Sequence, residues 1–568
     1  MVADAQQGDW VARSNENAQL LIDISTELSP EGAARLGVTG HDEEITILSA
    51  DLPERQRGLE REALAEFQRR LEAETDPLVK QDLEILIAET ERSIRSSEVS
   101  ERLELTYINV PGMLYAGVSS LLDDQIEESR RPAALIRLRR YLGLEEGYES
   151  AAQMAMARFG ESLEGPEGRL RIGPPVERVE QDLSDLDTYI NGIALLFEKY
   201  GIDGAPLVEL REQMEGFGEF VETQVLPRTR TDFRLPPELY ELNLESVGID
   251  YPIEELQAMA HRRFDEWQAE MQTVANRIAA ERGLESSDYR DVIRELKKAQ
   301  LNGEEILPHY EARLKQIEDI IRRENLITLP ERPAIIRLAS AAETAQQPAP
   351  HMRPPRLLNN HGERGEFVLP LVTGDAEGDQ LRYDDFTFEA ASWTILAHEA
   401  RPGHELQFDA MVEQGVSLAR ANYAFNSTNV EGWALYTEWV MLPYMSDEGK
   451  LISLQLRMLR AARAFLDPEL QQGVVTAEQA REVLRNDVVL SEAFADEEVD
   501  RYTFRSPGQA VSYFDGYLRL RELRDTVEAA LGDKFNLRAF HDFLLSQGLL
   551  PPSMLRDAVM QDFVAAQQ

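Results

Sequence analysis

The stretch HEARPGHELQ, residues 398–407, contains the side chains of this chain that are best suited to metal chemistry. The imidazoles of His398 and His404 are good zinc ligands, and the carboxylate of Glu399 follows the first of them directly. A carboxylate beside a metal can accept a proton from a bound water. These residue types therefore point to metal-assisted hydrolysis. Taken singly, however, either histidine could be a structural residue whose hydrogen bonds are satisfied in the core.

The spacing of the two histidines requires a break in the helix that carries them. Zinc-peptidase sequences of the form HExxH place two histidines four residues apart, about 40° around an α-helix, so both face one metal. His398 and His404 are six apart, which is about 240° around a regular helix. Pro402 donates no backbone hydrogen bond and its ring clashes with the carbonyl four residues back, while Gly403 tolerates unusual dihedral angles. We predict that TILAHEA is helical, that the chain bulges from Arg401 to Gly403, and that the bulge returns His404 to the metal.

A third ligand is expected from a downstream glutamate, because zinc bound by two histidines in a peptidase usually takes one. The stretch NVEGWALYTEW, residues 429–439, offers Glu431 and Glu438, which are seven apart and share a helix face. The same region allows a structural interpretation. Thr428 to Glu431 fits a capping box, in which Glu431 would satisfy the start of a helix. Periodicity alone does not choose between the two interpretations.

The composition restricts the class of protein. The chain of 568 residues has 59 basic and 103 acidic side chains and a formal net charge of −44. Such a charge repels nucleic acid and anionic membrane surfaces, so neither is an expected partner. There is no cysteine, which excludes disulfides, thiolate metal sites and a cysteine nucleophile, so any metal must be held by histidine and carboxylate. No apolar stretch reaches the roughly 18 residues of a membrane span.

The first residues, MVADAQQGDW, contain neither the basic nor the apolar segment of a signal peptide. They fit the beginning of a mature chain with an added Met. The absence of cysteine suits the periplasm without requiring it. We therefore expect a periplasmic, cell-envelope or secreted location in preference to a cytoplasmic one.

Hydrophobic periodicity predicts a mainly α fold. Residues 10–330 combine long charged segments with apolar residues at three- and four-residue spacing. The runs RPAIIRLAS and GEFVLPLV indicate short strands, joined by a Pro-, Asn- and Gly-rich connection. We predict a large multi-helix body in two halves around a cleft, with a small β-sheet near the active site. This continuous body is predicted to have an N-terminal helical half, 1–328, and a catalytic half, 329–568. The catalytic half would contain a sheet at 334–372, zinc helices at 386–445 and C-terminal helices at 446–568.

HEARPGHELQ followed by EGWALY resembles a bacterial family known as domain of unknown function 885, whose hallmark is HExxPGHxxQ and then an EGWALY helix. That family is similar to the helical gluzincin peptidases, which include angiotensin-converting enzyme, oligopeptidases and Taq-type carboxypeptidase. The resemblance is sharpest over residues 385–520. Many members carry a second histidine directly after the Gly-His pair, where this chain has Glu405. The positions that match are His398, Glu399, His404 and Glu431.

The resemblance implies an active site with one zinc ion. His398, His404 and Glu431 would hold the metal and leave one position for a water, whose pKa the metal lowers toward neutrality. Glu399 would accept the proton of this water and pass it to the leaving amine. Glu438 would orient a ligand histidine without touching the metal.

Groups that contact the substrate are expected in RYTFRSPGQAVSYFDGYLRL, residues 501–520. The Ser-Pro-Gly-Gln sequence that starts at Ser506 fits the beginning of a helix. Tyr513 and Tyr517 would lie one turn further in, four apart on one face, where two tyrosines are more often core residues than catalytic ones. The resemblance, however, includes a PGQALSY-like stretch, and related gluzincins use a late tyrosine to stabilise the tetrahedral intermediate. It therefore implies Tyr513 as the oxyanion donor.

Three further residues of this segment are candidates for substrate binding. Arg505 is the expected anchor for a substrate carboxylate, and Gln509 and Tyr517 would contact the substrate beside it. Upstream, GEFVLPLV could supply an edge strand that pairs with an extended peptide and aligns it beside the zinc. A strand that only covers the core is the equal alternative.

Together these expectations describe a zinc-dependent metallopeptidase that cleaves short peptides, as a carboxypeptidase or dipeptidyl carboxypeptidase. Two other functions stay open at this point. The metal site could hydrolyse another amide or an ester, or the chain could be a helical binding or scaffold protein whose motif no longer catalyses. The expected partner is a peptide or another small amide, and the sequence does not set an oligomeric state.

Overall fold

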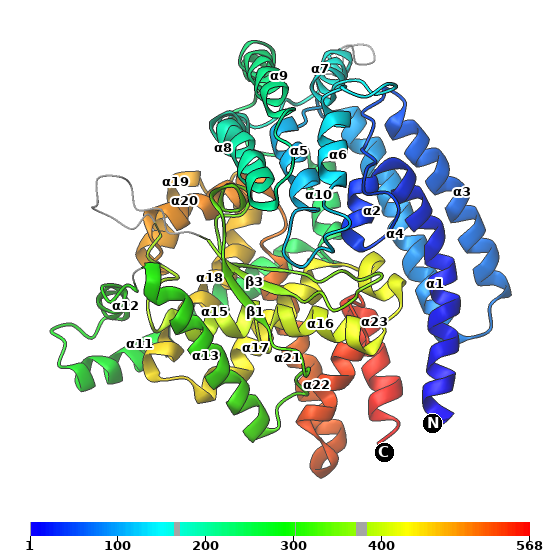
Figure 1. The fold of residues 1–568 in the computed structure, drawn as a ribbon. Helices are drawn as coiled ribbons and strands as arrows, with labels where there is room; N and C mark the ends of the chain where they lie inside the picture. The colour runs from blue at the N-terminus through cyan, green and yellow to red at the C-terminus, as the bar shows by residue number, and fades with distance from the viewer. Residues whose placement is uncertain (1, 164–170, 302, 371–382, 568) are drawn as a thin grey trace.

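The computed structural model describes residues 2–163, 171–301, 303–370 and 383–567. These residues form a body built almost entirely of helices, with one small sheet among them (Figure 1). The prediction of a mainly α fold is confirmed. Within these ranges, no helix is both long enough and apolar enough to cross a membrane.

The helices of the first half begin with α1 Val2–Leu28, α2 Pro30–Leu36, α3 Leu52–Ala73 and α4 Pro77–Leu103, drawn in blue in Figure 1. They continue with α5 Val110–Ser119, α6 Ala133–Tyr141, α7 Ala151–Ser162, α8 Val176–Tyr200 and α9 Leu207–Phe220. The last four before the sheet are α10 Pro237–Ser246, α11 Ile253–Arg282, α12 Tyr289–Lys297 and α13 Gly303–Glu324.

After the sheet and the short helix α14 Ala341–Gln346, the chain is helical again. The helices around the candidate site are α15 Ala391–Glu399, α16 His404–Gln414, α17 Ser427–Met441, α18 Asp447–Gln471 and α21 Ser512–Leu531. The others in this part are α19 Ala477–Glu482, α20 Glu492–Asp500, α22 Leu537–Ser546 and α23 Pro552–Ala558. A π-helical turn, η6 Arg501–Arg505, continues α20.

Helix α11 shows why these sequences become helices. Its buried residues include Leu256, Ala260, Phe264 and Trp267, which recur every three or four positions and therefore form one apolar stripe. Gly283, in the left-handed region at φ +66°, ends the helix. The stripe packs against α18.

The sheet has three strands, β1 Ile335–Leu338, β2 His351–Arg353 and β3 Glu366–Leu369, in the order β1-β3-β2. β3 pairs with β1 in parallel and with β2 antiparallel. Of the two alternatives left open for GEFVLPLV, the edge strand is excluded, because Glu366–Leu369 is buried between two partner strands. The last two residues of that run and of the predicted sheet lie outside the described residues. β2 also falls within the Pro-rich stretch that the sequence indicated as a connection.

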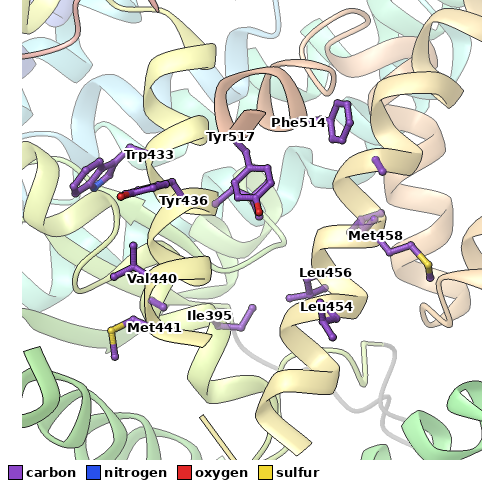
Figure 2. Close-up of a cluster of buried hydrophobic side chains, with 14 of the residues drawn as sticks. Ile395, Trp433, Tyr436, Val440, Met441, Leu454, Leu456, Met458, Phe514 and Tyr517 are labelled. Atoms are coloured by element: carbon purple, nitrogen blue, oxygen red, sulfur yellow. The ribbon is translucent and has the colours of Figure 1, made fainter. Parts of the chain in front are cut away.

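The largest apolar core joins helices on both sides of residue 328. Figure 2 shows part of it, where side chains of α15, α17, α18 and α21 meet. The same core includes α11 and α13, whereas α5 to α9 surround a second cluster and α1, α3 and α4 a third. The boundary predicted at residue 328 thus does not divide the core, since α11 and α13 pack with the C-terminal helices.

Candidate metal centre and substrate cavity

The helix that carries His398 is interrupted before His404. α15 ends at Glu399, α16 begins at His404, and residues 400–403 form the turn between them. The peptide bond before Pro402 is cis. The interruption agrees with the predicted bulge. It leaves the two imidazole rings 4.9 Å apart between centroids and nearly perpendicular, at 84°.

Gly403 allows the chain to make this turn. A Cβ at this position would lie 1.8 Å from the carbonyl oxygen of His398, so a side chain cannot be placed there without moving backbone. The indole Nε1 of Trp433 donates to the carbonyl oxygens of Pro402 at 3.0 Å and Gly403 at 3.3 Å. Because Trp433 lies on α17, this contact fixes the turn against the helix that also carries Glu431.

Glu431 lies in the second turn of α17 and does not cap it. The N-cap is Asn426, whose side-chain oxygen accepts a hydrogen bond from the backbone N–H of Asn429 at 2.8 Å. The capping-box interpretation of Thr428 to Glu431 is therefore wrong, because the helix begins at Ser427. The carboxylate of Glu431 faces the two histidines instead.

The side chains of His398, His404 and Glu431 converge on one point. Glu431 Oε2 is 3.3 Å from Nε2 of each histidine, and one ligand atom from each residue lies within 4.8 Å of the others. Yet this oxygen has no hydrogen-bond partner among the described residues, so neither short contact has hydrogen-bond geometry. Two imidazole nitrogens and a carboxylate oxygen are a zinc donor set, and the three residues fit such an ion. They are the one group of this kind found in the described part of the chain.

Glu438 contacts the opposite side of the His398 ring. Its carboxylate lies 2.8 Å from Nδ1 of His398 and accepts a hydrogen bond from the hydroxyl of Thr394 at 2.6 Å. Burial alone would lower the pKa of His398, but its interactions with Glu431 and Glu438 outweigh burial and raise the pKa to about 9. Burial likewise opposes ionisation of Glu431, yet the two imidazoles hold its pKa well below the usual value.

Glu399 lies at the boundary between this centre and a cavity of about 170 Å³. Its Oε1 is 3.9 Å from Nε2 of His398, and 14% of its side chain is exposed. The cavity is lined by Gln347, Ala349, Pro350, Phe386, Ile395, His398, Glu399, Leu456, Arg460, Arg463, Phe494, Glu497, Glu498, Arg501, Arg505, Ser506 and Tyr513. All of these follow residue 328, so the cavity lies within the predicted catalytic half and not between the two halves.

Tyr513 lines the same cavity from the first turn of α21. Its ring is parallel to that of His398 within 12°, with 6.3 Å between centroids. Its hydroxyl accepts a hydrogen bond from Arg501 at 2.9 Å, which leaves its own proton available to another acceptor. Burial raises the pKa of Tyr513, so the phenol stays protonated at neutral pH.

The comparisons with known proteins agree with this architecture. The family described as "Bacterial protein of unknown function (DUF885)" matches residues 30–559. The chain belongs to the DUF885 family. No match was found among curated proteins.

Two solved structures share the DUF885 chain's fold over nearly its whole length. One is described as a "putative lipoprotein of unknown function" from Shewanella oneidensis, with 18% identity, a TM-score of 0.72, and coverage of 96% of this chain and 99% of that one. The other is a "putative lipoprotein" from Colwellia psychrerythraea, with 17% identity, a TM-score of 0.74, and coverage of 97% and 99%. At these identities the likeness establishes the fold alone.

In the DUF885 chain, the residues predicted to contact substrate do not all line the cavity. Arg505 lines the cavity, but 41% of its side chain is exposed and it is paired with Glu497 at 3.5 Å. Gln509 is not among the lining residues, because its amide donates to the hydroxyl of Ser427 at the start of α17. The helix predicted to begin at Ser506 starts at Ser512, after a turn.

Tyr517 lies in the apolar core and does not line the cavity (Figure 2). Its hydroxyl accepts from Arg521 at 3.0 Å, and its ring packs against Trp267. One helical turn, about 5.4 Å along α21, separates it from Tyr513 and carries it past the cavity. Its predicted contact with substrate is therefore not supported.

Sequence reasoning missed three arginines that line the cavity, Arg460, Arg463 and Arg501. Arg460 and Arg463 are buried on α18, 7% and 4% exposed. For these two, the signal was present in LQLRMLRAARAFL, where arginines recur every three residues within an otherwise apolar helix. Such a pattern is unusual for a solvated face and indicates buried charge.

Glu405, in the first turn of α16, holds the preceding turn in place and is not part of the candidate metal centre. It is buried and receives two hydrogen bonds from Arg401, at 2.7 and 3.0 Å. Arg401 also bonds Glu318 at 2.7 Å and the carbonyl oxygen of Arg332 at 2.7 Å. Burial raises the pKa of Glu405 to about 7 although Arg401 opposes this. The pair therefore ties the turn to the helix α13 and to the segment before β1.

Proposed function

We propose that this DUF885 chain is a zinc-dependent metallopeptidase of gluzincin type that acts on short peptides. The observation that supports this most is the convergence of His398, His404 and Glu431 within 4.8 Å, beside a cavity that Glu399 also lines. A purely structural cluster would be expected to satisfy its buried carboxylate oxygens by hydrogen bonds, whereas Oε2 of Glu431, which faces Nε2 of both histidines, has no partner among the described residues.

The ligand set would hold one zinc ion. Zinc bound by two imidazoles and a carboxylate leaves a position for water and lowers the pKa of that water toward neutrality. Glu399 is next to His398 and partly exposed to the cavity, so it can accept a proton there and return it to the nitrogen of the broken peptide bond. Glu438 holds the ring of His398 through Nδ1.

Tyr513 is the proposed donor to the oxygen of the scissile carbonyl. Its hydroxyl already accepts from Arg501, so its proton can be donated to the negative charge that develops on this oxygen. This role is supported by the orientation of its ring, which lies parallel to that of His398 with 6.3 Å between the centroids. Arg501 would keep the hydroxyl oriented.

We also propose that the protein acts in the cell envelope. The support is the description of both structural neighbours as lipoproteins. Fractionation of the native host, with detection by antibody, tests this. Recovery in the cytoplasm would contradict it.

The decisive experiment measures zinc and peptide cleavage on the same preparations. Wild-type protein is expected to hold about one zinc per chain and to cleave members of a peptide library, read by mass spectrometry. Glu399→Gln should keep the zinc and lose nearly all turnover, because it removes only the base. Glu128→Gln, at a side chain that is 91% exposed, is the matched control and should leave both unchanged.

Three outcomes would overturn the proposal. Full cleavage by Glu399→Gln would remove the proposed base. Zinc-loaded wild-type protein that cleaves no peptide but hydrolyses other amides or esters would change the substrate class. A chain without stoichiometric zinc or turnover would instead be a binding protein.

A further inference from the structure

Arg457, in the middle of α18, is a buried guanidinium without a counter-charge. Only 3% of the residue is exposed, and neither Nε nor Nη2 has a hydrogen-bond partner among the described residues. Within the same ranges it forms no ion pair with a carboxylate. A buried charge is costly unless an opposite charge or hydrogen-bond acceptors surround it.

The other buried arginines of the described ranges do not have this problem. Each of the five has a carboxylate or a carbonyl oxygen as its partner: Arg137, Arg401, Arg420, Arg460 and Arg463. In three of them the bond from Nε to a carboxylate is 2.7 Å long. Arg457 is therefore the exception among the buried arginines that the structure describes.

Two aromatic rings face the guanidinium of Arg457. Its Cζ lies 5.5 Å from the ring centroid of Tyr517 on α21 and 5.9 Å from that of Trp267 on α11. A cation is attracted to an aromatic ring only weakly at a separation near about 6 Å. The rings supply no negative charge, so they do not replace a counter-ion.

A second guanidinium, that of Arg521, reaches the same tyrosine from one turn further along α21. Its Nη1 donates to the hydroxyl of Tyr517 at 3.0 Å, and its Cζ lies 3.4 Å from the ring centroid of Trp439. Its Nε is buried and has no partner among the described residues. Because the Tyr517 oxygen accepts from Arg521, its own proton is left to donate, and the hydroxyl points away from α21 (Figure 2).

The acidic side chains of the neighbouring helices are engaged elsewhere or exposed. Those with partners form these pairs: Asp515 with Arg519, Glu522 with Arg556, Glu528 with Arg524, and Glu438 with His398. Those that are exposed are Asp525 on α21, and Glu266 and Glu270 beside Trp267 on α11. No carboxylate of the described chain therefore matches the buried charge of Arg457.

The groups left without partners at this place can all donate hydrogen bonds. They are the N–H groups of Arg457 and Arg521 and the O–H of Tyr517. Ser453, one turn before Arg457 on the same face of α18, adds a buried hydroxyl without a partner among the described residues. Such donors exclude a metal cation, and a water molecule would bring two more donors. A ligand that only accepts and carries one negative charge satisfies both the hydrogen bonds and the buried charge.

We propose that Arg457, Tyr517 and Arg521 form a binding site for a small monovalent anion of the size of chloride, between α18 and α21. A divalent anion would cost much more to remove from water, and only one of the two guanidinium groups is fully buried. None of the three residues belongs to the candidate metal centre or lines the cavity beside it. The inference therefore does not depend on the proposed function. The bound anion joins two helices of the core and stabilises the fold.

Unfolding in different salts at one ionic strength tests this site, because charge screening then stays constant. The melting temperature of the full chain is measured in sodium gluconate, whose anion is too large to enter, while chloride replaces gluconate step by step. Chloride should raise the melting temperature by a few degrees, with the logarithm of its concentration once this exceeds the dissociation constant. In crystals soaked with bromide, anomalous scattering should place the ion beside Arg457 and Tyr517.

Substitutions separate the site from the general effect of salt. Arg457→Met should lose the response to chloride, and in gluconate it should be at least as stable as wild type, because it removes an unmatched buried charge. Tyr517→Phe keeps the ring and removes one donor, so it should weaken the response. Arg137→Met is the matched control, since this buried arginine donates to the carbonyl oxygen of Gly117. It should lose stability equally in both salts and keep the response to chloride.

Several results would count against the anion site. Equal melting temperatures in chloride and gluconate would overturn it, and so would an undiminished chloride response in Arg457→Met. Bromide bound elsewhere but not beside Arg457 would do the same. A larger stabilisation by formate than by chloride would overturn the halide and assign the site to a carboxylate. Zinc content and peptide cleavage enter none of these comparisons, so the result is independent of the proposed function.

Discussion

At the scale of single residues, Glu438 shows how a buried carboxylate can hold a candidate metal ligand in place without belonging to the proposed ligand set. It is fully buried and contacts Nδ1 of His398, while Arg460 lies 3.5 Å away. A proton on Nδ1, donated to Glu438, leaves the lone pair of Nε2 for the side that faces Glu431. Glu431 and Glu438, seven positions apart on one helix, therefore face different nitrogens of the His398 ring.

This division of roles predicts different losses for the two glutamates. Glu431→Gln should lose stoichiometric zinc, because it removes the only carboxylate of the proposed ligand set. Glu438→Gln should keep zinc with an affinity about 10- to 100-fold weaker, since it only orients His398. Competition with a chelator of known zinc affinity measures both. If Glu438→Gln lost zinc while Glu431→Gln retained it, the wrong glutamate would have been assigned as the ligand.

At the scale of elements, the turn between α15 and α16 determines where His404 lies relative to His398. Gly403 brings backbone so close to the carbonyl of His398 that a methyl group has no room. Trp433 on α17 and the Arg401–Glu405 pair then hold the turn from two sides. The site is thus positioned by contacts among several helices and not by one helix alone.

Gly403→Ala should therefore destabilise the fold by about 2 to 3 kcal/mol and weaken zinc binding, because backbone must move to admit the methyl group. Thermal unfolding and zinc titration of the same samples give the two effects. Gly160→Ala is the matched control, since a Cβ there meets nothing within 4 Å and α7 should gain up to about 1 kcal/mol. Unchanged stability and zinc affinity in Gly403→Ala would show that the turn does not need glycine.

Asp467 joins three elements near the cavity and should make stability depend on pH. From α18 it accepts hydrogen bonds from Tyr240 on α10 and from the backbone N–H of Gly508, in the turn before α21. Burial raises its pKa from 3.8 to about 7 although these bonds oppose the shift. Between pH 4 and 7 the Asp467 carboxyl is therefore protonated in the folded state but ionised in the unfolded state. Its contribution to the free energy of unfolding is fully present below about pH 4 and is lost as the pH rises to 7.

Asp467→Asn should remove the part of the pH dependence of stability that Asp467 causes, because an amide does not titrate. The stability of the variant relative to wild type should rise between pH 5 and 8, by roughly 3 kcal/mol at most. Denaturant unfolding of both proteins at each pH measures the difference, and other titrating groups cancel in the comparison. A constant difference across this range would mean that Asp467 is ionised in the folded state throughout.

The same elements show what the sequence could predict. The helix break could be predicted from the sequence, because Pro402 and Gly403 act locally, on the backbone at their own positions. The start of α17 was missed because Asn426 competes with Thr428 as the cap, and both fit the local pattern. The central place of β3 and the arginines of the cavity depend on which segments meet in space, which periodicity does not encode.

At the scale of the whole molecule, the net charge of −44 sets the sign of the long-range electrostatics. Ion pairs cover much of the helical surface, but exposed pairs contribute little each. The excess carboxylates repel one another in the folded state more than in the expanded chain.

Repulsion among the excess carboxylates predicts that salt stabilises the fold. Raising NaCl from about 0.05 to 1 M shortens the screening length from above 10 Å to about 3 Å, so the melting temperature at pH 7.5 should rise by several degrees. KCl should act equally, because screening depends on ionic strength and not on the ion. The response should shrink as pH approaches the pI of about 4.6, where the net charge vanishes. A melting temperature that falls with salt at pH 7.5 would show that the surface ion pairs outweigh the repulsion.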